Sequence, residues 1–131
     1  MGNPVSSLNV VRASASHSIG TTYTSGFKIE SCDKLIFFCD ITAKSGTLPT
    51  LNINVETTPE HEASGATYYV LSEKFVEMNA VGNYYKVIVR TDGLAKHVRL
   101  KFTVGGSATP TVTFQARMLK IIRTRGGAAI E

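Results

Sequence analysis

The chain has 131 residues, which fits one ordinary domain and leaves no room for two. Hydrophobic residues make up 43% and charged residues 18%, as in a globular protein, and the net charge of +4 is too small to demand a nucleic-acid partner. No apolar run approaches the ~20 residues that span a bilayer, so we expect no membrane association. The first twenty residues show neither the basic leader nor the apolar stretch of a secretory signal, which favours a protein made in the cytoplasm.

The N-terminal residues 1–20 are rich in Ser and Ala, and we interpret them as an arm. Within and after this arm, weaker strand patterns cover residues 5–13 and 22–29. We assign residues 21–122 to a β domain and residues 123–131, which are basic and then Gly/Ala-rich, to a C-terminal tail.

The clearest strand pattern begins at Leu35. Leu35, Phe37, Cys39 and Ile41 alternate with residues that are themselves partly apolar, which indicates a central, well-covered strand. A dense turn signal at 44–49 follows, and residues 51–57 then alternate cleanly. Two such runs joined by a short Gly/Pro connection predict an antiparallel hairpin.

Farther along the chain, residues 68–71 form a weak strand pattern, and 71–80 is the best helical candidate, with a strand or loop as the alternative. Alternation returns at 84–91, at 97–104 and at 111–122, with a Gly/Pro break at 105–110. Seven to nine strands at spacings of roughly ten residues predict an all-β fold: an antiparallel sandwich of jelly-roll type, or a small barrel.

Candidate chemistry is sparse. Cys32 and Cys39 match no zinc or redox spacing, and we expect reduced, structural cysteines. His61 lies between two glutamates but has no second histidine nearby in sequence, so a solvated loop is the plain interpretation. No P-loop, nucleophile elbow or metalloprotease motif occurs, and we therefore predict no cofactor, no metal and no enzymatic activity.

One strand carries a basic face, formed by His97, Arg99 and Lys101. Tyr84 and Tyr85 could add stacking surfaces, as in proteins that bind single-stranded nucleic acid. Five more basic residues could lie near: Lys96, Arg117, Lys120, Arg123 and Arg125. An outward strand face must be polar in any case, and an acidic protein surface suits these charges better than nucleic acid.

Two stretches carry a resemblance: DITAKSGTLPTLNINVET (residues 40–57) and VRLKFTVGGSATPTVTF (residues 98–114). Both are similar to hairpins of head decoration, or cement, proteins of tailed double-stranded DNA bacteriophages. The resemblance implies a structural protein on the outside of the virion capsid, made in the host cytoplasm. Its implied partners are the major capsid protein and further copies of itself. A homotrimer would suit local threefold positions of a capsid and a homodimer would suit twofold positions, and we favour the trimer.

Extended arms can add strands to a neighbour's sheet, and several arms per oligomer raise avidity. We therefore expect the capsid or partner contacts to involve the arms and the basic face: Val5, Leu8, Val10, Arg12, Arg99, Lys101, Arg123 and Arg125. Two alternatives remain: a tail or neck component of the virion, and a module that recognises carbohydrate or another surface. The absence of Trp counts against a sugar reader.

Overall fold

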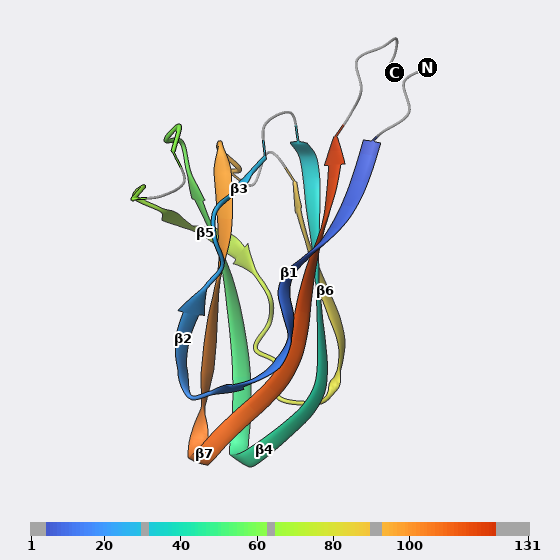
Figure 1. The fold of residues 1–131 in the computed structure, drawn as a ribbon, viewed down its shortest axis with the longest axis vertical. Coiled ribbons are helices and arrows are strands. Elements are labelled where there is room, and N and C mark those ends of the chain that lie inside the picture. Colours follow the sequence, from blue (N-terminus) through green and yellow to red (C-terminus); the bar gives the residue numbers. More distant parts are fainter. Residues whose placement is uncertain (1–4, 30–31, 63–64, 90–92, 123–131) are drawn as a thin grey trace.

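The computed structural model describes residues 5–29, 32–62, 65–89 and 93–122. Within these ranges the chain is all β, and no helix occurs that could cross a membrane (Figure 1). The strands are β1 (Val5–Ser18), β2 (Gly20–Tyr23), β3 (Phe27–Lys28), β4 (Cys32–Thr58), β5 (Tyr69–Lys74), β6 (Gly82–Val89) and β7 (His97–Ile122).

Two very long strands organise the fold. β4 and β7 pair antiparallel from Cys32 opposite Ile122 at one end to Thr58 opposite His97 at the other. Register shifts interrupt the pairing where β4 passes residues 41–50, and both strands bend there, at the lower end of the molecule in Figure 1. The two-stranded ribbon thus folds over, and its two halves lie in different layers.

Each layer consists of four strands side by side, where each half of the long strands β4 and β7 counts as one strand and β2 and β3 together count as one. The first layer has the order β1–β7–β4–β6 and contains the late half of β7 and the early half of β4. In the second layer, β2 and β3 pair with the early half of β7, and β5 pairs with the late half of β4. A folded antiparallel ribbon flanked in this way is a jelly roll, so the predicted all-β sandwich is confirmed. The sheet is not closed into a barrel.

The expected hairpin across the turn at 44–49 is wrong. The two halves of β4 pair with β7 rather than with each other, because the turn carries the strand from one layer to the other. The bends of β4 and β7 nest tightly: Gly46 adopts a φ of 91°, and a Cβ placed on it would lie 2.6 Å from the Pro110 Cα. Only glycine fits this approach.

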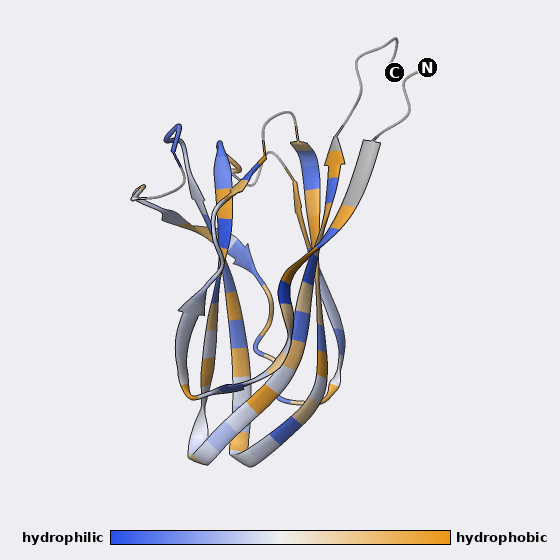
Figure 2. Cartoon of the chain, viewed as in Figure 1, coloured by the Kyte–Doolittle hydropathy of each residue, from blue (hydrophilic) through white to orange (hydrophobic). Residues whose placement is uncertain are grey.

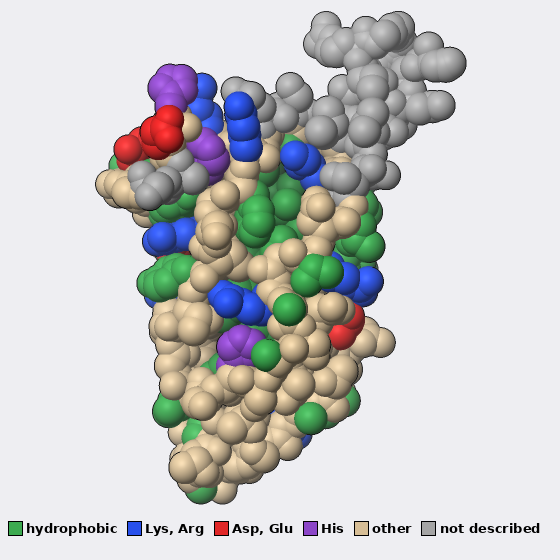
Figure 3. Space-filling view, in the orientation of Figure 1, with side chains coloured by type: hydrophobic (Ala, Val, Ile, Leu, Met, Phe, Trp, Pro, Cys, Tyr) green, Lys and Arg blue, Asp and Glu red, His purple; other side chains and the backbone are tan. Residues whose placement is uncertain are grey.

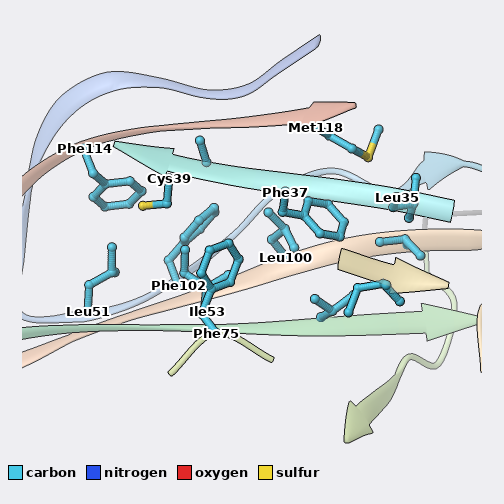
Figure 4. Close-up of a cluster of buried hydrophobic side chains, with 14 of the residues drawn as sticks. Leu35, Phe37, Cys39, Leu51, Ile53, Phe75, Leu100, Phe102, Phe114 and Met118 are labelled. Atoms are coloured by element: carbon cyan, nitrogen blue, oxygen red, sulfur yellow. The ribbon is translucent and has the colours of Figure 1, made fainter. Parts of the chain in front are cut away.

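The core lies between the two layers. Hydrophobic and hydrophilic residues alternate along β4 and β7 (Figure 2), so each strand sends one set of side chains inward. Phe37, Phe102 and Phe114 are almost completely buried, and the rings of Phe102 and Phe114 lie 5.2 Å apart (Figure 4). Cys39 is a buried thiol in the same cluster.

Two other expectations change. Residues 5–18, placed in an N-terminal arm by the sequence, form β1 and pair with the late half of β7. The helical candidate at 71–80 is a strand followed by a loop, whose Met78 exchanges backbone hydrogen bonds with Leu51. Phe75 and Met78 still enter the core, as a helix would have placed them, so burial rather than helix formation explains these apolar residues.

Candidate binding surfaces

The outward side of the first layer is unusually apolar. On β4, Leu35, Phe37 and Cys39 point into the core, so Ile36 and Phe38 between them point outward. Strands β1, β6 and β7 place further apolar side chains on the same outward side, as their pairing register shows. We call the resulting surface the apolar outer face; it consists of Leu8, Val10, Ile36, Phe38, Tyr85, Val87, Leu119 and Ile121.

Solvent reaches the two outer strands of this face most freely, and its other residues are half-buried. Leu8 and Val10 on β1 are 53% and 55% exposed, and Tyr85 on β6 is 69% exposed. One ion pair lies at one end of the face, between Arg117 Nη2 and Asp40 Oδ2 at 3.1 Å. The Arg117 guanidinium carbon also lies 5.8 Å from the centre of the Phe38 ring, so this cation is held against an aromatic side chain.

The outward side of the second layer is polar and aromatic. We call its centre the arginine–tyrosine cluster; it consists of Tyr23, Glu56, Tyr68, Arg99 and Lys101. The Arg99 guanidinium lies 4.4 Å from the Tyr23 ring centre and 4.1 Å from that of Tyr68. Its Nε donates to Glu56 Oε1 at 2.7 Å, and Glu56 is only 5% exposed.

These contacts fix Arg99 and leave its neighbours accessible. Burial raises the pKa of Tyr68 above its usual value, and the positive charge of Arg99 partly opposes that rise. Tyr23 remains 45% exposed beside the half-buried Lys101, which is its register partner on β7. A rigid aromatic ring beside a cation is a surface suited to protein recognition.

The residues predicted as contacts divide between these surfaces. Leu8 and Val10 belong to the apolar outer face, whereas Arg99 and Lys101 belong to the arginine–tyrosine cluster in the other layer. Arg12 lies at the margin between β1 and β2, where its Nη2 donates to the Tyr23 carbonyl at 2.8 Å and its guanidinium lies 5.0 Å from the Phe102 ring centre.

The remaining contact predictions are not described at side-chain level. Val5 begins β1, where it pairs with Ile122 through the backbone. Arg123 and Arg125, with the expected tail over 123–131, lie outside the described residues.

The basic face is smaller than the sequence indicated. His97 is buried, and its Nδ1 lies 3.1 Å from the Glu60 carbonyl oxygen. Arg117 and Lys120 lie on the late half of β7 and therefore in the first layer, as do Tyr84 and Tyr85 on β6. The tyrosines expected to supply stacking surfaces beside Arg99 are thus replaced by Tyr23 and Tyr68.

Most residues of the apolar outer face were not predicted from the sequence. The available signal was that Ile36 and Phe38 make both sides of one strand apolar, which we interpreted as a strand covered on both sides. In the structure the outer strands of this side expose Leu8, Val10 and Tyr85, and Ile36 and Phe38 between them are half-buried.

Ion and hydrogen-bond contacts join the layers at their margins. On one margin Lys86 of β6 reaches Glu73 of β5, with Nζ 2.7 Å from Oε1. On the other, Arg12 joins β1 to β2 as described above. In Figure 3 the lower end of the molecule, where β4 and β7 bend, presents mostly uncharged polar and backbone atoms, while charged side chains gather higher up.

Groups suited to other chemistry are few in the described ranges. No cluster of three or more His, Cys, Asp or Glu residues that could hold a metal ion occurs there. Burial raises the pKa of the Cys39 thiol to about 12, with a further contribution from the Asp40 carboxylate. A thiol held protonated in this way is a poor nucleophile and a poor metal ligand.

The sequence matches no protein-family model and no curated protein. Solved structures share the fold. The SPBc2 prophage-derived protein YomS aligns with a TM-score of 0.58 and 11% sequence identity, over 92% of this chain and 96% of that one. Two capsid structures of infectious bursal disease virus, a T13 viral particle and a VP2 subviral particle, each align with a TM-score of 0.56 at 8% and 10% identity. The alignments cover 92% of this chain but only 31% and 33% of those viral chains.

Proposed function

We propose that this chain is a structural protein of a virus particle, and specifically a decoration protein that binds the outside of a bacteriophage capsid and stabilises it. The observation that carries the proposal is the fold likeness. The jelly roll matches nearly the full length of a prophage-derived protein and one region of a chain that forms viral particles. Such a protein acts by binding, in the virion, and needs neither a cofactor nor a catalytic group.

The arginine–tyrosine cluster is the surface we assign to the capsid. Arg99 is held between two aromatic rings and a carboxylate, so binding does not have to order it. Lys101 supplies a charge beside it that can meet an acidic patch on the major capsid protein. Its half-buried stem keeps the apolar part of the side chain against the sheet.

The test uses heads of the encoding virus assembled without this chain. Added purified protein is expected to sediment with the heads and to raise their thermal disruption temperature. Lys101→Glu reverses the charge within the cluster and should weaken head binding about tenfold or more.

Lys44→Glu is the matched control, because Lys44 is exposed near the bend of β4, away from the cluster. It should bind as the unaltered protein does. Unaltered protein that stays in the supernatant would overturn the proposal, and binding to purified tails instead would favour a tail or neck component. Equal losses in the two variants would overturn the assignment to the cluster.

A surface-recognition module is the second candidate, favoured by one feature. The exposed Tyr85 ring lies between two hollows of about 290 and 450 Å³, which share Asn83, Tyr84 and Tyr85 in their linings. An aromatic ring beside amide groups suits the face of a sugar. Glycan-array binding that disappears in Tyr85→Ser would support this function, and a silent array would exclude it for the glycans displayed.

A further inference from the structure

The apolar outer face is the largest feature that the proposed capsid contact leaves unused. Leu8, Val10 and Tyr85 are each more than half exposed, and they lie on two different strands of one continuous layer. Contiguous exposed apolar surface of this kind marks an interaction site in a soluble protein. We propose that this face binds the same face of a second copy of the chain, related by a twofold axis.

The size of the face suits the centre of such an interface. Four strands at a spacing of about 4.8 Å and five residues at about 3.3 Å each give roughly 320 Å² per copy. Stable interfaces bury about 800 Å² per partner, with an apolar centre inside a polar rim. Asp40, Asn83 and Gln115 continue the layer beyond one end of the face, and Lys34 lies at the other end. They can supply the polar rim.

The charges within the face complement themselves. Each copy carries the Arg117–Asp40 ion pair at one end of the face and Lys34 at the other end. A twofold axis brings the Arg117 of each copy towards the Asp40 of the other, so the pair can be shared across the interface without net like-charge repulsion. Two twisted sheets pack face to face at about −30°, and this geometry is available to two copies of the same layer.

The strand edges are poorer association sites than the face. On β6, Lys86 points towards the space between the layers and is held by Glu73, which places a charge at that edge. β1 has two register shifts, between Val10 and Arg12 and between Arg12 and Ala15. Charges and bulges are the features by which proteins protect sheet edges from strand addition.

A surface that binds itself is isologous and closes as a pair, so this inference gives a dimer where symmetry matching to local threefold positions of a capsid favoured a trimer. In the dimer both arginine–tyrosine clusters point away from the interface, because they lie on the opposite layer of each copy. Self-association and head binding therefore use different surfaces and can fail separately.

The test is the solution mass of the full chain by light scattering over a hundredfold range of concentration. We expect a dimer. Val10→Glu should weaken dimerisation about 100-fold or more, because two carboxylates would be desolvated in one apolar interface. Val70→Glu is the matched control: Val70 is also a strand residue and is 60% exposed, but it lies on β5 in the other layer.

A second pair avoids introducing charge. Tyr85→Ser should weaken the dimer, whereas Tyr69→Ser, at 59% exposure on β5, should not. Equal urea midpoints for the monomeric forms would show that all four variants fold. A strictly monomeric unaltered protein would overturn the inference, as would equal dissociation within either matched pair. A monomer whose head binding is lost in Val10→Glu would show instead that this face contacts the capsid.

Discussion

The two layers of this sandwich are built from the same two strands, yet their outward sides differ in kind. On the early half of β4 the outward residues include Ile36 and Phe38, whereas on the late half they are Asn52, Asn54 and Glu56. The inward sets are equally apolar in both halves. The inward side chains therefore specify the fold. The outward side chains make the second layer compatible with water, whereas the first layer would be stabilised by a partner that covers its apolar side chains.

This difference extends to the charges of each side. Glu56 is buried against Arg99, and two tyrosine rings cover that guanidinium. The Asp40–Arg117 pair is more open, with side chains 25% and 34% exposed. The first pair fixes a surface in place, whereas the second leaves groups that can exchange partners when another molecule covers them.

The largest expected effect comes from the core that both layers share. Phe102 is 1% exposed and packs against Phe114. Phe102→Ala should lower the free energy of unfolding by about 3–5 kcal/mol, because it leaves a cavity between the layers. Urea unfolding measures the change. A loss below about 1 kcal/mol would mean that the layers do not pack on this ring.

The ion pairs provide an intermediate effect that distinguishes the two sides. Glu56→Gln should cost about 1–3 kcal/mol of unfolding free energy, because it removes the charge of a buried carboxylate that pairs with Arg99. Asp40→Asn should cost less than about 1 kcal/mol, because its pair is more exposed. The comparison is made by urea unfolding at neutral pH and low protein concentration. Equal costs would contradict the difference we draw between the two sides.

The buried thiol of Cys39 should make stability depend on pH only in alkaline solution. Its pKa is raised to about 12 in the folded protein from an ordinary value of 9.0, so the unfolded chain loses this proton first as pH rises. Stability should therefore be constant below pH 9 as far as this group is concerned, and should fall between pH 9 and pH 12 by at most about 1.4 kcal/mol per pH unit.

Cys39→Ala is the control for that effect, since other groups also titrate in this range. The difference in unfolding free energy between the two proteins should shrink as pH rises from 8 to 10. A difference that stays constant would show that the thiol is not shielded from water.

Much of the fold follows from the sequence, because inward alternation at Leu35–Ile41, 51–55 and 98–104 is read directly from residue order. The pairing does not follow in the same way. A turn rich in Gly and Pro is compatible with a hairpin and with a bend between layers. The turn at Gly46 is a bend because both halves of β4 pair with β7, which lies more than fifty residues away in the sequence.

The sequence predicts part of the arginine–tyrosine cluster but not the apolar outer face. Lys101 and Arg99 were recognised as outward because they alternate with Leu100 and Phe102. The apolar outer face was missed because Ile36 and Phe38 have the same pattern whether a neighbouring layer covers them or water does. The sequence of one strand does not contain that information.

Spin-label distances within the dimer show whether two copies meet through the first layer. One label replaces the exposed Asn83, at the margin of the apolar outer face, and in a second protein one replaces the exposed Thr21 on the outward side of the second layer. With layers about 10 Å apart, we expect label-to-label distances below roughly 30 Å for Asn83→Cys and above roughly 35 Å for Thr21→Cys. The reverse order, or no dipolar coupling from Asn83→Cys at concentrations where the protein is dimeric, would contradict this arrangement.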